Sequence, residues 1–280
     1  MPKAIYKYRI WGDENTDRII KNKEIYLASP GIFKDGYNEC ILKERYDLVT
    51  TALLMEKIKQ DTRNEFKWMT EKDVETRAMK RINDCKFFDT DNRKQVEQWS
   101  NKIQNDNLGI FCSSISKTSI EMWEKFGNLS TGYCVGLIPS ELIKNPKLSG
   151  QFGKVKYYPE SKPPEILPIN LNKDDALYNA ILQNFSVPQR FKYENEYRIA
   201  KYNFSRNEYS GEFFRIKYDL NSRRVEISEK CYKEIILGSE IYCQDKKDIV
   251  KLCAINLPNI PIYESIFDEK TKKISFKKIN

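Results

Sequence analysis

The chain has 280 residues, of which 40% are hydrophobic and 31% are charged. That length allows one large domain or two small ones with a full core, and the composition is typical of a globular protein. No stretch reaches the roughly 20 apolar residues of a membrane span, and the N-terminus has no apolar signal segment. We therefore expect a cytoplasmic protein with no membrane partner.

The reactive residue types restrict the chemistry. The sequence contains no histidine, and its seven cysteines are scattered without a Cys-x-x-Cys pair. This excludes Ser-His-Asp and Cys-His catalysis and favours reduced thiols over a disulfide frame or a zinc site. We expect no metal, so that any catalysis must use Glu, Asp, Tyr, Ser, Lys, Arg or Cys.

The charge is moderately basic, with 48 Lys and Arg against 40 Asp and Glu and a net charge of +8. Such an excess favours anionic ligands, but it is smaller and more evenly mixed than in a dedicated nucleic-acid binder. The one local basic run, residues 270–278, is interpreted as a solvated end of the chain.

The first elements follow from local patterns. Alternation over residues 4–10 predicts an opening strand, followed by a short helix ending near Asn22 and a short strand over residues 24–28. Residues 33–39 are expected to form a loop. From about 43 to 106 the apolar residues recur at helical spacing, with a cap at residues 70–73, which predicts a helical insert that covers a sheet or a cleft.

Beyond the insert, strands alternate irregularly with helices. Strands are predicted at residues 108–116, 132–138, 154–158, 191–200, 212–218, 224–227, 234–237 and 260–263. Helices are predicted after a cap at Thr118 or Ser119, before Pro188, and over residues 244–254. Because there is no strict βαβ alternation, the sequence predicts an α+β fold with a mixed, largely antiparallel core, in one domain spanning residues 1–280.

The stretch Phe191-Lys192-Tyr193-Glu194-Asn195-Glu196-Tyr197-Arg198-Ile199-Ala200 is the candidate functional segment. In a strand, the spacing of Glu194 and Glu196 places both carboxylates on one face. Beside a cleft, their repulsion would raise the pKa of one of them and suit it to acid–base work. On a solvated strand face, the same pair would have no function.

Several ordered motifs resemble a bacterial family known as domain of unknown function 2971. The resemblance is carried by Tyr6-Lys7-Tyr8-Arg9, Leu27-Ala28-Ser29-Pro30, the serine strand, Met122-Trp123, Gly132, Tyr193-Glu194-Asn195-Glu196-Tyr197-Arg198 and Glu234-Ile235-Ile236-Leu237-Gly238. The chain departs from the family at Phe33-Lys34-Asp35-Gly36-Tyr37 and at Phe126-Gly127-Asn128-Leu129-Ser130, where the family has a histidine. Any role of that histidine is therefore absent.

More distantly, the chain resembles ADP-ribosyltransferases of the Arg-Ser-Glu type. That group carries an arginine at the end of its first strand, a Ser-x-Ser strand and a Glu-x-Glu or Gln-x-Glu segment. Here Arg9, Ser114-Ile115-Ser116 (or Ser113) and Glu194-Asn195-Glu196 occur in the same order. The resemblance implies a split β-sheet of the ADP-ribosyltransferase type and NAD as the substrate.

The resemblance also implies roles for these residues. Arg9 would bind the NAD pyrophosphate, because a guanidinium forms paired charge-assisted hydrogen bonds with phosphate. Glu196 would stabilise the positive charge that develops on the ribose, and Glu194 would activate the acceptor. Ser114 or Ser116 would orient Glu196. Tyr8 and Trp123 complete the expected cofactor-binding residues, with Trp123 able to stack on nicotinamide.

Three functions follow as alternatives. The first is an NAD-dependent ADP-ribosyltransferase or NAD glycohydrolase, such as a toxin or defence effector, with a protein or nucleic acid as acceptor. The second is a non-catalytic sensor that binds a nucleotide or another anion, and the third is a nucleic-acid-binding module. The first requires that Arg9 and Glu196 face one cleft.

Structural roles compete with each assignment. Arg9 could pair with a carboxylate across the sheet, and the serines could form a strand end and a helix cap. Trp123 could belong to the core, and Arg198 could be the ion-pair partner of Glu196.

Overall fold

The computed structural model describes residues 1–33, 42–85, 89–171, 173–206, 213–215 and 217–279. The chain divides into two compact units. The sheet unit comprises Met1–Ser29, Asn107–Tyr157 and Pro188–Asn280, and the helical unit comprises Pro30–Asp106 and Tyr158–Val187. The helical unit therefore joins the predicted insert to a second, later segment of the chain.

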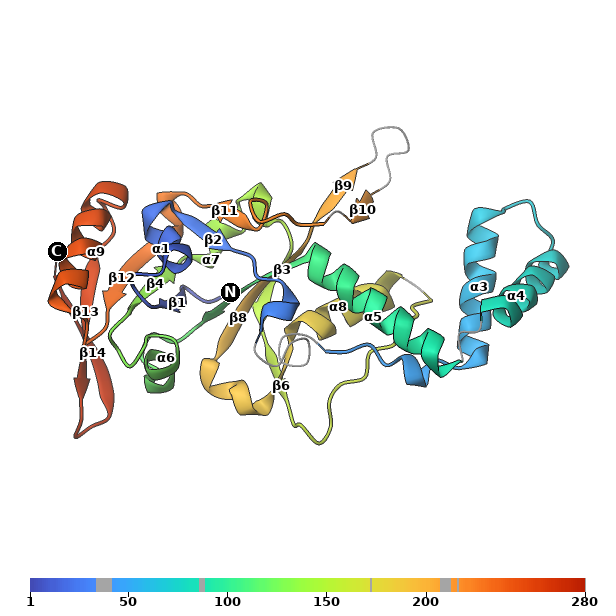
Figure 1. The fold of residues 1–280 in the computed structure, drawn as a ribbon, viewed down its shortest axis with the longest axis horizontal. Coiled ribbons are helices and arrows are strands. Elements are labelled where there is room, and N and C mark those ends of the chain that lie inside the picture. Colours follow the sequence, from blue (N-terminus) through green and yellow to red (C-terminus); the bar gives the residue numbers. More distant parts are fainter. Residues whose placement is uncertain (34–41, 86–88, 172, 207–212, 216, 280) are drawn as a thin grey trace. The chain divides into compact units, whose positions relative to one another are not determined.

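The sheet unit is built on an eight-stranded sheet, counted over the described residues, in the order β14-β13-β12-β4-β1-β3-β8-β5 (Figure 1). Its strands are β1 (Ile5–Arg9), β3 (Leu108–Ser114), β4 (Tyr133–Leu137), β5 (Gln151–Lys154), β8 (Glu196–Tyr202), β12 (Tyr232–Leu237), β13 (Ile262–Asp268) and β14 (Lys273–Lys278). Neighbours pair antiparallel, except β12 and β13, which are parallel. The predicted α+β class and largely antiparallel core are confirmed.

The sheet opens between β1 and β3. All five residues of β1 pair with β4, whereas a single pair, Tyr6 with Ser114, joins β1 to β3. Beyond this pair, the side chain of Lys7 donates to the carbonyl oxygen of Cys112. A lysine ammonium thus binds a carbonyl of β3 where a continuous ladder would place a backbone N–H.

Helices cover both faces of the sheet. On the first face, the core joins Ile5, Val135 and Ile235 to apolar residues of α1 (Glu14–Lys21) and α9 (Cys243–Asn256). On the second face, Tyr6 and Tyr8 pack with residues of α6 (Ile120–Lys125). Because side chains of a strand alternate between faces, odd-numbered residues of β1 lie on the first face and even-numbered residues on the second.

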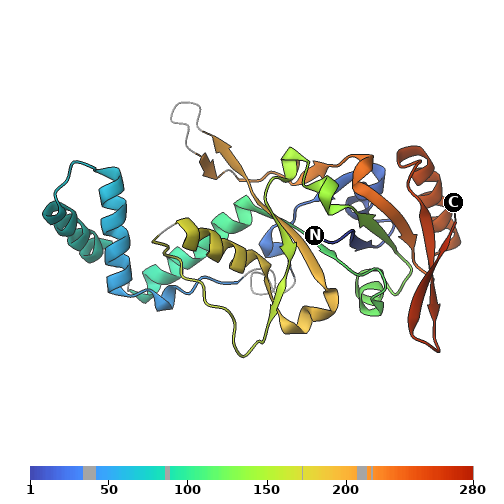
Figure 2. The ribbon, with the colours of Figure 1, turned by 180° about the vertical axis from the view of Figure 1, so that it is seen from behind.

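The basic segment 270–278 carries exposed lysines, as expected for a solvated end of the chain, but it also forms a strand that was not predicted. β13 and β14 form an antiparallel hairpin with α9 beside it, visible from both sides in Figures 1 and 2. Alternation explains the strand, because Ile274 and Phe276 pack toward the second face while Lys273 and Lys277 are exposed. The lysines therefore occupy the wet side of an edge strand, where they oppose aggregation.

The strand predicted over residues 191–200 was wrong in its first half. A short 3-10 helix covers Gln189–Glu194, and β8 begins only at Glu196. Between them, Asn195 adopts a left-handed conformation with φ 45° and ψ 54°, which asparagine tolerates better than most residues. Glu194 and Glu196 therefore do not alternate along one strand, and the face-sharing argument does not apply to them.

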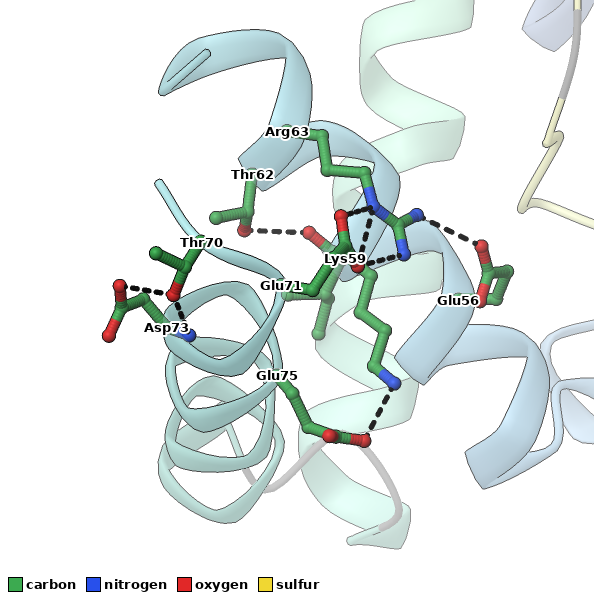
Figure 3. A network of polar contacts seen from close by, with 9 residues as sticks. Glu56, Lys59, Thr62, Arg63, Thr70, Glu71, Asp73 and Glu75 are labelled. Carbon is green, nitrogen blue, oxygen red and sulfur yellow. Dashed lines mark hydrogen bonds and ion pairs between the residues drawn. The ribbon is translucent and has the colours of Figure 1, made fainter. Parts of the chain in front are cut away.

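The helical unit contains α3 (Thr51–Glu65), α4 (Glu71–Cys85), α5 (Thr90–Asn107) and α8 (Lys173–Phe185). The predicted cap of the second of these is confirmed, since Thr70 Oγ1 accepts a hydrogen bond from the Asp73 N–H at 3.3 Å. Polar contacts connect α3 to α4 (Figure 3). Arg63 pairs with Glu56 on its own helix and with Glu71 on the next.

The remaining elements are β2 (Glu24–Tyr26), β6 (Lys156–Tyr158), α7 (Pro139–Leu142), β7 (Ser186–Pro188), β9 (Phe204–Arg206), β10 (Phe213–Arg215) and β11 (Arg224–Glu226). Of these, β2, β6, β10 and β11 overlap predicted strands, whereas α7, β7 and β9 were not predicted. The predicted strand at 154–158 is divided between β5 and β6. Most of the expected loop at 33–39 lies outside the described residues. No helix in the described ranges has the length and hydropathy needed to cross a bilayer.

Candidate functional site

The second face of the sheet brings together most of the predicted site residues. Ser114 pairs with Tyr6 on one side and Glu196 on the other, so the three side chains share this face. Tyr8 lies on the same face, where its ring meets Trp123 edge-on with centroids 5.0 Å apart. Its hydroxyl donates to the carbonyl oxygen of Ser116 at 2.8 Å.

Local contacts already engage the serines and Trp123. Ser114 Oγ accepts from the Ser116 N–H at 3.1 Å, and Ser116 Oγ accepts from the Thr118 N–H at 3.2 Å. Ser119 caps α6, as expected for one of the two predicted caps. Trp123 is buried and donates through Nε1 to the Lys117 carbonyl at 3.1 Å. These contacts match the strand-end, cap and core interpretations of the sequence.

Glu196 is held by Arg198 in a buried, two-pronged ion pair. Arg198 Nε lies 2.7 Å from Oε1 and Arg198 Nη2 lies 3.0 Å from Oε2 of Glu196, with side-chain exposures of 3% and 4%. Both carboxylate oxygens therefore face a guanidinium that satisfies them. The backbone N–H of Glu196 donates to the Tyr157 hydroxyl at 2.7 Å. This arrangement matches the structural alternative for the stretch, in which Arg198 is the partner of Glu196.

Glu194 differs from Glu196 in its environment. It ends the 3-10 helix, is half-buried, and carries no guanidinium partner of the Arg198 kind among the described contacts. Burial, and then the nearby charge of Glu196, raise the pKa of Glu194 from 4.5 to about 7. Glu194 is therefore able to exchange a proton near neutral pH.

Arg9 does not join this group. It lies three residues after Tyr6 on β1 and pairs with Tyr133, a core residue of the first face. Its side chain therefore lies on the face opposite to Glu196. The arrangement implied by the ADP-ribosyltransferase resemblance, with Arg9 and Glu196 facing one cleft, is not formed across the sheet.

The structural alternative for Arg9 was an ion pair with a carboxylate across the sheet. The guanidinium of Arg9 forms no such pair with the described residues. Within the described part of the chain it has no hydrogen bond or ion pair, and Asp13 is the one carboxylate that contributes to its electrostatic environment. Burial lowers the pKa of Arg9. The residue is thus a partly buried cation with no protein anion bound to it.

Lys7 is a site residue that sequence reasoning missed. It lies on the same face of β1 as Arg9, two residues earlier, with its ammonium bound to the Cys112 carbonyl. Burial, and then the charge of Arg9, lower the pKa of Lys7 from 10.5 to about 7. The i, i+2 rule that was applied to the two glutamates would have grouped Lys7 with Arg9.

Lys7 also connects the two faces electrostatically. The charges of Glu196 and Glu194 raise the pKa of Lys7, although neither carboxylate forms an ion pair with it among the described residues. The junction of β1 and β3 thus has two cations on one face and the two glutamates within electrostatic range. No group of three metal-ligating residues is found in the ranges that the structure describes.

Comparisons with known proteins leave the chain without an assigned relative: no family model matches it, and neither a curated protein nor a solved structure is significantly similar.

Proposed function

We propose that this chain binds a nucleotide with a diphosphate group, such as NAD, through Arg9 and Lys7, and that it acts as a binding domain. One observation carries the proposal: two partly buried cations lie side by side on β1, and neither forms an ion pair with a carboxylate of the described residues. Buried charges in proteins are generally paired, and in the ranges that the structure describes no anion is paired with either cation.

The chemistry of the two side chains suits a diphosphate. Residues at i and i+2 of a strand lie about 7 Å apart, so that each phosphoryl group can meet one cation. The Arg9 guanidinium offers a planar fork of donors, and the Lys7 ammonium keeps donors beyond the one used by Cys112. A bound anion would offset the repulsion between the two cations.

The charge of the sheet unit supports an anionic ligand. This unit contains 31 Lys and Arg and 21 Asp and Glu, which gives +10, whereas the whole chain carries +8. The excess of positive charge therefore belongs to the unit that holds Lys7 and Arg9. Such an excess raises the local concentration of anions and the rate of their association.

The environment of Glu196 favours binding over catalysis by this residue. A carboxylate that stabilises a ribose cation must present an oxygen to the sugar, and both oxygens of Glu196 are bound to Arg198. Arg9 lies on the face of the sheet opposite to Glu196, which also favours binding over catalysis by Glu196. The sensor alternative thus fits the contacts better than a transferase that uses Glu196.

Titration calorimetry with ADP, NAD, AMP and inorganic phosphate tests the proposal on the intact chain. We expect ADP and NAD to bind more tightly than AMP and phosphate, because only the first two carry a diphosphate. Arg9→Gln and Lys7→Met should each weaken ADP binding by about 10–100-fold, the effect of one charge-assisted contact. Equal affinities for ADP and AMP, or binding that falls steeply with salt for RNA alone, would contradict it.

A second candidate, NAD cleavage, rests on Glu194 alone. Its pKa of about 7 suits a general acid or base at neutral pH. The assay is release of nicotinamide from NAD by the wild type, Glu194→Gln and Glu196→Gln. Turnover that is lost in Glu194→Gln while NAD still binds would establish this candidate. If NAD binds but none of the three proteins turns it over, the chain acts as a binding domain and not as an enzyme for NAD cleavage.

A further inference from the structure

A second charged cluster on the sheet unit involves none of the residues of the proposed site. Lys117 lies in the segment between β3 and α6, and its ammonium is surrounded by aromatic rings from three strands. The ammonium lies 4.5 Å from the ring centre of Phe276, 5.7 Å from that of Tyr263 and 6.0 Å from that of Tyr6. These distances are those of favourable cation–π contacts.

A buried carboxylate also binds this ammonium, and the Lys117 side chain remains 30% exposed. Lys117 Nζ donates to both carboxylate oxygens of Glu234, at 3.1 Å and 3.0 Å. The Tyr6 hydroxyl donates to Glu234 Oε1 at 2.9 Å. Glu234 is 4% exposed, so that these two partners take the place of water at its carboxylate. Residues from β1, β12, β13 and β14 therefore converge on one lysine.

The segment that carries Lys117 also organises part of the second face. The Lys117 carbonyl accepts the hydrogen bond from Trp123 Nε1, and Ser116 precedes it with the carbonyl that binds Tyr8. The rings around the ammonium come partly from the C-terminal hairpin, β13 and β14. One side chain thus joins the 115–119 segment to a hairpin more than a hundred residues later.

We propose that Lys117 is a latch that makes the 115–119 segment and the β13–β14 hairpin open and close as one cooperative unit. When the ammonium moves away, the hairpin loses its cation–π contacts with Lys117, and the 115–119 segment loses its ion pair with Glu234. This inference is independent of the proposed nucleotide site, because neither Lys7 nor Arg9 takes part in it.

Hydrogen–deuterium exchange of the intact chain, followed by mass spectrometry, tests the latch. In Lys117→Met, amides of β14 and of the segment around 115–119 should exchange about 30-fold faster or more, and by similar factors. Lys117→Arg should keep most of the protection, since it retains the charge. Lys277→Met, on the solvent side of the same hairpin, should exchange like the wild type.

The double variant Lys117→Met/Glu234→Gln separates loss of the latch from burial of an unpaired carboxylate. We expect this double variant to restore the stability of the central strands, whereas the amides of the hairpin and of the 115–119 segment should still exchange fast. Protection of β14 equal to that of the wild type in Lys117→Met would overturn the proposal. So would faster exchange of the hairpin with an unchanged 115–119 segment, or an equal increase throughout the sheet unit.

Discussion

Replacing Arg198 by methionine tests the assignment of Glu196 to the structure of the sheet. Methionine is apolar and retains most of the length of the arginine side chain. The substitution therefore leaves the Glu196 carboxylate buried without its guanidinium partner. The side chains of Arg198 and Glu196 are 3% and 4% exposed, so water cannot replace the lost partner without opening the strand. Breaking a buried pair in this way costs about 3–5 kcal/mol.

The double-mutant cycle measures the coupling of the pair directly. The four proteins are the wild type, Arg198→Met, Glu196→Met and the double variant, each unfolded in urea and followed by circular dichroism. We expect the double variant to be more stable than either single variant, because apolar replacement of both partners removes the unpaired charge. The coupling energy should therefore be about 2 kcal/mol or more.

A less buried pair provides a control. Arg18 Nε and Glu24 Oε2 are separated by 2.7 Å, the same distance as in the buried pair, but their side chains are 23% and 21% exposed. The cycle on this pair should give a much smaller coupling, because solvent screens exposed charges. If Arg198→Met cost less than about 1 kcal/mol, or the two cycles agreed, the structural role of Glu196 would be refuted.

Three further predictions concern Glu194, Lys7 and Asn195. Because the pKa of Glu194 is about 7 in the folded chain and 4.5 when unperturbed, stability should fall by up to roughly 3 kcal/mol as the pH rises from 4.5 to 7, and urea unfolding of Glu194→Gln should lack this fall. The pKa of Lys7 is lowered from 10.5 to about 7, so stability should decrease as the pH falls through this window; Lys7→Met, measured in the same way from pH 7 to 10, should be flatter. Asn195→Ala should cost about 1 kcal/mol because alanine disfavours the left-handed conformation, whereas Asn195→Gly should be close to neutral in the thermal midpoint.

Much of the fold follows from local sequence patterns. The alternation that predicted the opening strand is the alternation of β1, and the cap at Thr70 begins α4. Both signals depend on residues within a few positions of one another. The largely antiparallel class could be predicted for the same reason, since the strands showed no strict βαβ order.

The sequence predictions were wrong where a single backbone conformation or a single long-range contact determines the local structure. A single left-handed residue, Asn195, ends a helical turn and starts β8, and the aromatic and β-branched residues around it concealed that break. The final basic run was judged by its charge, although the spacing of Ile274 and Phe276 had the period of a strand. In that segment, the spacing of the apolar residues indicated the strand, whereas the charge did not.

For the candidate site, too, some residues could be placed from the sequence and others could not. Register brought Tyr8, Ser114 and Glu196 to one face, as a common site required, but the same register places Arg9 on the other. Sequence alone could not give the register of β1 against β3, because it depends on one long-range pair. The approach of Lys117 to Glu234, over 117 positions, had no local signal at all.

The central claim is that Arg9 binds the phosphate groups of a nucleotide, and calorimetric titration of ADP into the wild type and Arg9→Gln tests it most directly. Arg224→Gln is the matched control, since Arg224 belongs to the same unit and already donates to Asn15. The account predicts a dissociation constant about 10–100-fold higher in Arg9→Gln and unchanged in Arg224→Gln. Equal affinity of Arg9→Gln and the wild type, or no binding to the wild type, would contradict it.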